Sequence, residues 1–122
     1  MPTAVLLIAH GSRRAEANAD LDQLAELLRA RDLYPIVETA YLDVTQPDIP
    51  AGGRKCVQRG ADVVLMLPYF LSAGSHVVDD LEAYRRTLSA EFPHVKFELC
   101  PPLGLHPKML EIVLDRLNER FG

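Results

Sequence analysis

Two histidines are the residues of this sequence best suited to chemistry. His10 directly follows the apolar run Thr3–Ala9, and His76 follows the apolar run Ala61–Leu71 after a short polar link. If the two runs are neighbouring parallel strands, about 4.8 Å apart, both imidazoles emerge at the same edge of a sheet. Neutral imidazole binds transition metals and accepts protons, so the pair predicts a divalent-metal site or a pair of proton acceptors. A structural zinc site would need four protein ligands, and no others have suitable spacing, so an open site completed by a substrate fits better.

The residues beside both histidines suit an anionic ligand. Glycine allows the backbone to turn sharply and to approach a ligand closely. Serine often caps a helix, and the free N–H groups of a helix amino end attract carboxylates and phosphates. Two arginines add positive charge at the same place, although they could equally be solvated residues of a first helical turn. The candidate ligand-contacting residues are Gly11, Ser12, Arg13, Arg14, Gly74 and Ser75.

Two acidic residues are further candidates for the site. Asp80 lies four residues after His76, on the same helical face, where it could orient the imidazole or contact a substrate. Asp43 ends a predicted strand at the same edge, where it could be a third metal ligand or a proton acceptor. An ordinary turn residue is the simpler interpretation of Asp43.

The remaining histidines and the cysteines have simpler interpretations. His106 precedes Pro107 and is expected to cap a helix, and His94 is assigned no role. Cys56 and Cys100 are too few and too isolated for a disulfide framework or a thiolate metal site, so both are expected to pack in or near the core.

The elements that must position these residues alternate between strands and helices. The apolar runs Thr3–Ala9 and Ala61–Leu71 suit strands buried on both faces of a parallel sheet. The stretches Tyr34–Leu42 and Val95–Cys100 also resemble strands but carry charges, which suits edge strands that water can reach. Apolar residues at helical spacing predict helices between and after the strands. The stripes are Ala17, Leu21, Leu24 and Leu28; Ile49, Gly53, Cys56 and Val57 within Gln46–Arg59; Val77, Leu81, Tyr84 and Leu88; and Leu110, Val113, Leu114, Leu117 and Phe121.

This alternation predicts one α/β domain over residues 1–122, with a four-stranded parallel sheet and helices on both faces. The apolar first and third strands belong in the middle and the charged strands at the edges, which gives the flavodoxin-like order 2-1-3-4. Ligands of such sheets bind beyond the carboxyl ends of the strands, where the order reverses. Here the reversal falls between the first and third strands, which carry His10 and His76.

The composition narrows the class of protein. The net charge of −4 over 122 residues gives no basic footprint for nucleic acid and no polybasic stretch for an anionic membrane. The apolar runs are shorter than the roughly 20 residues that a transmembrane helix needs, and no signal peptide is recognised. We therefore expect a cytoplasmic protein with no membrane or nucleic-acid partner.

The motifs together resemble a known family, the small single-domain sirohydrochlorin chelatases of the CbiX type among the class II chelatases. The likeness covers nearly the whole chain. Asp43 stands where the family often has the longer Glu. The matching segments are Ala9-His10-Gly11-Ser12-Arg13, Ala40-Tyr41-Leu42-Asp43, Leu67 to His76 with Asp80, and Pro102 to Pro107.

The resemblance implies a lyase that inserts a divalent metal into sirohydrochlorin, a step of cobalamin or siroheme biosynthesis, and releases two pyrrole protons. The metal is then a substrate, with Co²⁺ favoured and Fe²⁺ or Ni²⁺ as alternatives, and no prosthetic group is expected. His10 and His76 match the positions that family members use for metal binding and deprotonation. The substrate's carboxylates would give Arg13, Arg14 and the helix amino ends something to hold.

Size adds the expectation of a homodimer. A four-stranded sheet is only about 15–20 Å wide, so one domain offers a wall and not a closed cleft to a broad macrocycle. Larger relatives consist of two similar halves, and this chain resembles one of them. A second copy would therefore face the macrocycle from the other side.

Three other functions use some of the same features. A cobalt or nickel carrier would use both histidines without catalysis. A histidine phosphatase would want an arginine before His10, where Ala9 stands. A nucleotide-binding regulator of flavodoxin-like fold would want a glycine-rich phosphate loop, which the sequence lacks.

Overall fold

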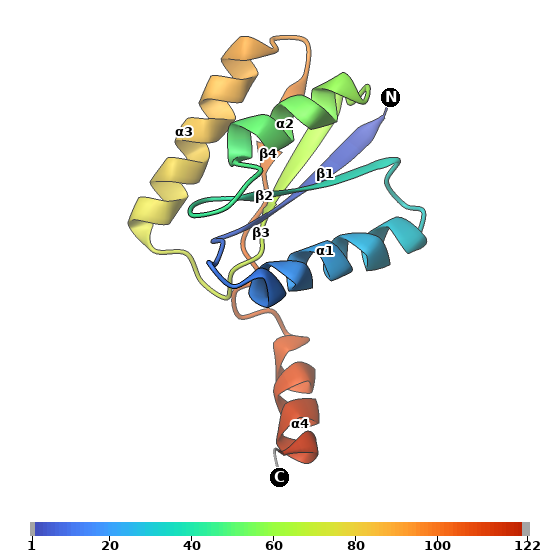
Figure 1. The fold of residues 1–122 in the computed structure, drawn as a ribbon, viewed down its shortest axis with the longest axis vertical. Coiled ribbons are helices and arrows are strands. Elements are labelled where there is room, and N and C mark those ends of the chain that lie inside the picture. Colours follow the sequence, from blue (N-terminus) through green and yellow to red (C-terminus); the bar gives the residue numbers. More distant parts are fainter. Residues whose placement is uncertain (1, 121–122) are drawn as a thin grey trace.

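The computed structural model describes residues 2–120 and shows strands and helices in strict alternation (Figure 1). Each predicted strand and helix is present, and Phe121 of the fourth predicted stripe lies outside the described residues. The elements are β1 (Thr3–Ala9), α1 (Ala15–Ala30), β2 (Ile36–Tyr41), α2 (Ile49–Gln58), β3 (Val63–Pro68), α3 (Ser75–Glu91), β4 (Lys96–Leu99) and α4 (Met109–Glu119).

The strands form one parallel sheet in the order β2-β1-β3-β4. Successive side chains of a strand point to opposite faces, so β1 contributes to both halves of the core. Leu6 and Ile8 pack with α2 and α3, whereas Val5 and Leu7 pack with α1 on the other face. The predicted strand order and the placement of helices on both faces are confirmed.

Two glycines allow α2 to pack closely between the sheet and α3. A Cβ atom on Gly52 would lie 2.9 Å from side-chain atoms of Ala40 and Leu6, and one on Gly53 would lie 2.7 Å from Leu88. Both glycines are buried. Their cost in helix propensity, up to about 1 kcal/mol each, is offset by the close contact that they permit.

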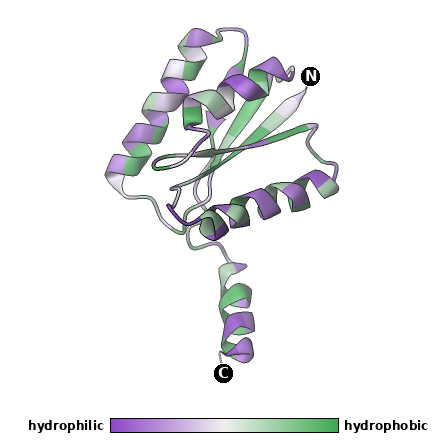
Figure 2. Ribbon diagram, in the orientation of Figure 1, coloured by the Kyte–Doolittle hydropathy of each residue, from purple (hydrophilic) through white to green (hydrophobic). Residues whose placement is uncertain are grey.

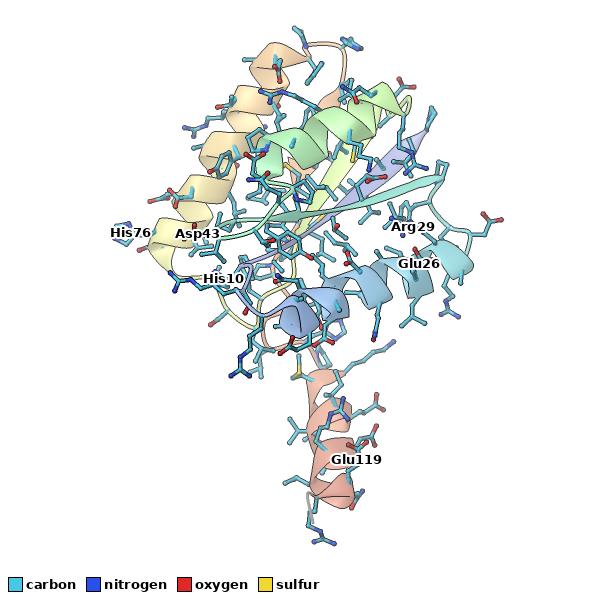
Figure 3. All side chains as sticks on the ribbon, in the orientation of Figure 1. His10, Glu26, Arg29, Asp43, His76 and Glu119 are labelled. Atoms are coloured by element: carbon cyan, nitrogen blue, oxygen red, sulfur yellow. The ribbon has the colours of Figure 1, made fainter. Side chains whose placement is uncertain are left out.

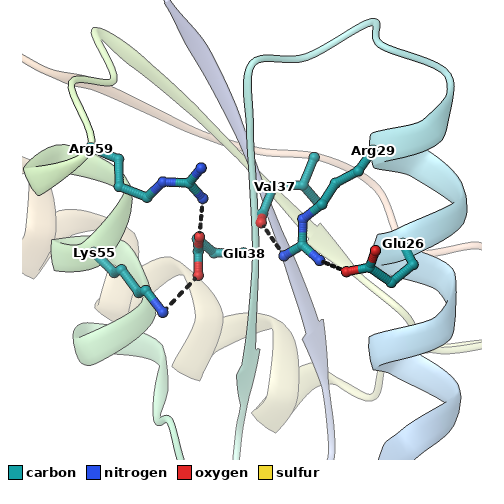
Figure 4. A network of polar contacts seen from close by, with 6 residues as sticks. All are labelled: Glu26, Arg29, Val37, Glu38, Lys55 and Arg59. Atoms are coloured by element: carbon teal, nitrogen blue, oxygen red, sulfur yellow. Dashed lines mark hydrogen bonds and ion pairs between the residues drawn. The ribbon is translucent and has the colours of Figure 1, made fainter.

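The edge position of β2 is confirmed, but the charge in this strand has another reason. Glu38 is only 7% exposed and faces α2, where it pairs with Arg59 and with Lys55, whose Nζ lies 3.3 Å from Oε1 (Figure 4). A buried carboxylate is stable only with such partners. On the other face, Arg29 of α1 donates a hydrogen bond of 2.6 Å to the Val37 carbonyl. The charge of Glu38 therefore ties β2 to the α2 side of the sheet, not to water.

The structure corrects two expectations about burial. The third strand was expected to be buried on both faces, but only alternate residues of β3 are buried, and the face toward α1 is half-buried. The apolar stripe of the fourth helix was expected to face the core, but α4 has no buried residue and points away from the sheet (Figure 1).

Within residues 2–120, none of the helices combines the length and the apolarity that crossing a membrane would require.

Candidate functional site at the carboxyl edge of the sheet

The structure places both histidines at the carboxyl edge of the sheet, as predicted. His10 is the residue after β1, which pairs directly with β3. His76 is the second residue of α3, the helix that follows β3. Both side chains are exposed, and Figure 3 shows His10, Asp43 and His76 at the same end of the molecule.

The His10 ring is held by an aromatic contact that the sequence reasoning missed. It stacks on the buried Phe70, with ring centroids 4.2 Å apart and planes inclined by 26°. The loop after β3 brings Phe70 to this position, where the Tyr69 N–H donates to the Ile8 carbonyl (2.6 Å). Phe70 lies inside the apolar run Ala61–Leu71, and this apolar pattern gave no signal for a ring contact with His10. The stacked ring leaves the imidazole nitrogens at the edge while restricting the orientation of the ring.

The turn after His10 depends on Gly11. Gly11 has a φ of +95°, and a Cβ atom there would lie 2.1 Å from the carbonyl oxygen of Asp43. The neighbouring Asp43 N–H donates a 2.9 Å hydrogen bond to the His10 carbonyl. The sequence predicted that Gly11 allows a close approach to a ligand, but the close approach in the structure is to the loop after β2. This contact fixes the backbone beside His10.

Asn18 is a second residue that sequence reasoning missed. Its side chain accepts a hydrogen bond from the Ser12 N–H (2.9 Å) and donates one to the Ser12 carbonyl (2.7 Å). The Tyr41 hydroxyl donates to the Asn18 carbonyl (3.1 Å), and burial, with a smaller contribution from Asp22, raises the pKa of that hydroxyl. Asn18 therefore clamps the loop that carries His10 onto α1. A polar residue in the first turn of a helix gave no specific signal for this role.

The predicted serine caps are wrong. The Ser12 hydroxyl accepts a hydrogen bond from the Arg14 N–H (3.1 Å) in the loop before α1, and α1 has no side-chain cap. Ser75 is itself the first residue of α3, after the N-cap Gly74, and that helix also lacks a side-chain cap. The N–H groups at the start of α3 are consequently not occupied by a capping side chain, which suits the predicted anion-binding role.

Neither candidate acid uses its carboxylate to contact a histidine side chain among the described residues. Asp80 is exposed, and no hydrogen bond or ion pair joins it to His76 in the described chain. The Asp43 carboxylate accepts a hydrogen bond from the Val44 N–H (2.8 Å). Residues 2–120 include no group of three or more His, Cys, Asp or Glu side chains placed to hold a metal ion. A third ligand from Asp43 therefore stays a prediction, and its present contact is that of a turn residue.

The remaining candidates lie where the sequence placed them. Arg13 and Arg14 are exposed at the start of α1, on the histidine edge. His106 accepts a hydrogen bond at Nδ1 from the Lys108 N–H (3.1 Å) in the turn before α4, but α4 has no side-chain cap, so the expected helix-capping role is wrong.

The two cysteines also pack as expected. Cys56 is fully buried and Cys100 is half-buried, and neither forms a disulfide. Burial raises the pKa of the Cys56 thiol to about 12, so it stays protonated. Cys56 therefore belongs to the core, whereas Cys100 follows β4 at the carboxyl end of the sheet.

The edge itself is shallow. A hollow of about 270 Å³ lies beside it, between α3 and the segment after β4, and neither histidine lines it. The hollow is lined by Pro68, Ala73, Val78, Leu81, Leu99, Cys100, Pro101 and Pro102. A space of this size is at the lower end for small-molecule pockets, so a broad ligand would have to lie across the edge and not inside the subunit.

The fold and this edge define a flavodoxin-like α/β domain with a histidine-bearing ligand edge. The family model CbiX matches residues 4–120, so the chain belongs to the CbiX family. It is 34% identical over 94% of its length to a chloroplastic sirohydrochlorin ferrochelatase of Arabidopsis thaliana, of which it covers 51%. It is 35% identical over 96% of its length to a sirohydrochlorin cobaltochelatase of Priestia megaterium, of which it covers 38%.

A solved structure shows the same fold. The sirohydrochlorin chelatase SirB from Bacillus subtilis subspecies spizizenii, in complex with cobalt, superposes with a TM-score of 0.90 at 24% identity. The match covers 98% of this chain and 51% of the SirB chain. The chain thus spans about half of the SirB structure and of the Arabidopsis thaliana relative, and 38% of the Priestia megaterium relative.

Proposed function

We propose that this chain inserts a divalent metal ion into sirohydrochlorin. The observation that carries the proposal is the position of His10 and His76, which follow neighbouring strands at the carboxyl edge of the sheet. The names of the related proteins, sirohydrochlorin ferrochelatase and cobaltochelatase, supply the substrate. Both cobalt and iron occur among these names, so the metal is proposed only as a divalent transition metal, with Co²⁺ as the first to test.

The residues have distinct proposed roles. His10 and His76 bind the incoming metal ion and accept the two pyrrole protons, because a neutral imidazole can do either. Arg13, Arg14 and the uncapped start of α3 at Gly74 hold carboxylates of the substrate. Ser12, Ser75 and Asp80 are proposed as further substrate contacts, and Asp43 as an additional ligand.

We further propose that the working enzyme is a homodimer. One subunit presents only an edge with a small hollow beside it. The cobaltochelatase of Priestia megaterium is more than twice as long as this chain. A macrocycle bound across the edge would leave its other face in water unless a second subunit covered it. The dimer would supply that second wall.

An absorbance assay with sirohydrochlorin and Co²⁺, Fe²⁺ or Ni²⁺ tests the function. We expect metal insertion faster than the spontaneous reaction, and a loss of roughly 100-fold or more in His10→Ala and in His76→Ala. His94→Ala is the control, because His94 lies before β4, away from this edge, where its ring is edge-on to Phe92. Normal insertion by either histidine variant would remove that residue from the mechanism.

The same assay separates the enzyme from a metal carrier. A carrier would bind the metal through the same two histidines without accelerating insertion. Metal binding by the wild-type protein can be measured by calorimetry. If the protein binds the metal but insertion proceeds only at the spontaneous rate, the chain is a carrier.

A further inference from the structure

Val44, in the loop after β2, has a strained backbone conformation. Its φ is +57°, in the left-handed region. The Thr45 N–H donates a 2.8 Å hydrogen bond to the Asp43 carbonyl, so Val44 is the central residue of a three-residue turn. A γ-turn with a positive φ is rare and strained, and a β-branched side chain makes the left-handed region more unfavourable. A glycine at this position would adopt the same turn without that cost.

Contacts of the neighbouring residue hold the strained turn beside His10. The Asp43 N–H donates to the His10 carbonyl (2.9 Å), and the Asp43 carboxylate accepts a hydrogen bond from the Val44 N–H (2.8 Å). The Asp43 carbonyl also lies against Gly11, where an added Cβ atom would be only 2.1 Å away. Val44 therefore cannot relax to an ordinary conformation unless this part of the loop moves. Figure 3 shows Asp43, the residue before Val44, at the same end of the molecule as both histidines.

The Val44 side chain contributes little to the core. It is 54% exposed and belongs to neither core cluster. Figure 2 shows the apolar character of the strands, which the helices on both faces cover in part, whereas Val44 lies beyond the end of β2. A single exposed apolar residue is ordinary on a protein surface. An exposed apolar residue held in a strained turn is different, because such strain is typical of ligand-binding sites.

Val44 has an apolar counterpart on the other side of His10. Leu71, in the loop after β3, is 66% exposed. Because β1 lies between β2 and β3, the loops after these two strands flank the residue that follows β1, which is His10. Positions two strands apart are separated by about 10 Å. The edge therefore carries an imidazole between two exposed apolar residues, and Arg13 and Arg14 follow the imidazole closely in the sequence.

We propose that Val44 supports one face of the sirohydrochlorin ring, with Leu71 as its counterpart, and so determines the affinity of this chain for the macrocycle. The inference rests on the proposed function and adds how the face of the ring is bound, in contrast to its carboxylates. Apolar side chains suit the face of a flat macrocycle, and a few charged groups suit its rim. The turn is fixed and the side chain of valine is stiff, so little conformational entropy is lost on binding.

A contact with the facing subunit is the competing explanation of the exposed side chain. The loop exposes one apolar residue, which stands between the polar residues Asp43 and Thr45. Protein interfaces bury larger continuous surfaces, of about 800 Å² per partner. A single stiff side chain beside His10 fits a small flat ligand better. The experiment below therefore includes the mass of the protein in solution.

Two substitutions separate the side chain of Val44 from its backbone. Val44→Gly removes both the strain and the side chain, whereas Val44→Asn places in the turn a residue that tolerates the left-handed region but is polar. We expect the melting temperature to be unchanged or higher in both variants, and to rise by about 2–5 °C in Val44→Gly. The Kd for sirohydrochlorin, measured without metal by absorbance titration, should rise about threefold to tenfold in both, because the ring no longer buries half of a valine side chain.

Asp32→Gly is the matched control. Asp32 also has a left-handed backbone (φ +55°) and is exposed, but it lies between α1 and β2, at the opposite end of β2 from the histidine edge. Asp32→Gly should therefore keep the wild-type Kd for sirohydrochlorin. The affinity for Co²⁺ alone, measured by calorimetry, should be the same in all variants, because the side chain of Val44 has no ligand atom.

Three results would overturn the proposal alone. They are a wild-type Kd for sirohydrochlorin in both Val44 variants, a lower melting temperature in Val44→Gly, and a wild-type dimer that becomes monomeric in either variant by light scattering. A wild-type protein that does not bind sirohydrochlorin would overturn the proposal together with the proposed function. If the wild type binds sirohydrochlorin with an affinity that depends on Val44 but inserts no metal, only the chelatase function is refuted.

Discussion

Replacing Gly11 by alanine tests how the backbone holds His10 at the edge. At the φ of +95° found for Gly11, an alanine is strained by its own Cβ atom. That atom would also lie 2.1 Å from the carbonyl oxygen of Asp43, more than 1 Å inside an ordinary contact. The loop after β2 must therefore move, and the hydrogen bond from the Asp43 N–H to the His10 carbonyl lengthens or breaks.

The expected loss of stability follows from these contacts. A left-handed backbone costs a non-glycine residue about 1–2 kcal/mol, and a lost backbone hydrogen bond costs about 0.5–1.5 kcal/mol. Displacement of the loop adds to this, so Gly11→Ala should lower the free energy of unfolding by about 3 kcal/mol. For a domain of this size, the melting temperature should fall by about 10–15 °C.

Two other glycines serve as controls that separate the strain of a left-handed backbone from the close contact with the loop after β2. Gly60 has a φ of +100° but nothing within 4 Å of an added Cβ atom, so Gly60→Ala should cost only the left-handed strain, about 1–2 kcal/mol. Gly74 has a φ of −68° and equally open surroundings, so Gly74→Ala should change stability by less than about 1 kcal/mol. Urea unfolding of the three variants gives the comparison. If Gly11→Ala loses no more free energy of unfolding than Gly60→Ala, the close contact between Gly11 and the loop after β2 does not stabilise the backbone beside His10.

Two further predictions concern the loop clamp and the buried thiol. Asn18→Ala removes both hydrogen bonds to the Ser12 backbone, so the free energy of unfolding should fall by about 1–3 kcal/mol in thermal unfolding. Asn18→Asp keeps the acceptor for the Ser12 N–H and should lose less stability. Equal losses in the two variants would show that the acceptor contributes nothing. The Cys56 thiol has a folded-state pKa of about 12 against 9.0 for a free thiol, so the stability that it contributes is complete below pH 9 and is lost as pH rises toward 12. Between pH 8 and pH 10.5, the wild-type protein should therefore lose about 2 kcal/mol more than Cys56→Ala. Parallel pH profiles for wild type and Cys56→Ala would contradict the burial argument.

The sheet was predictable from the sequence because burial depends directly on residue type. The run Thr3–Ala9 can only be accommodated between two covering layers, and the structure buries it on both faces. The charges of Tyr34–Leu42 correctly placed β2 at an edge. The reason was different, however, because Glu38 is buried and is paired by Lys55 of α2 and by Arg59 directly after this helix, both far from it in the sequence. Pattern alone does not distinguish a charge that faces water from one that faces a partner.

The position of the candidate site was predictable from the sequence, but the contacts that hold its residues in place were not. His10 and His76 lie at the expected edge because the topology brings the carboxyl ends of β1 and β3 together. The contacts that brace the His10 loop come from Phe70 and from Asn18, and each involves a specific side-chain geometry. The prediction of serine caps was wrong because a cap depends on the exact residue at which the helix begins, and sequence patterns do not define that residue so closely.

The two histidines differ in how firmly this chain holds them. The His10 ring rests on Phe70, its carbonyl accepts a hydrogen bond from the β2 loop, and the clamp by Asn18 begins two residues later. His76 lies exposed on the first turn of α3, with no hydrogen bond or ion pair from its side chain to the described residues. In the proposed reaction, the metal ion would therefore meet one ligand of fixed orientation and one that must be oriented by the substrate or by the facing subunit.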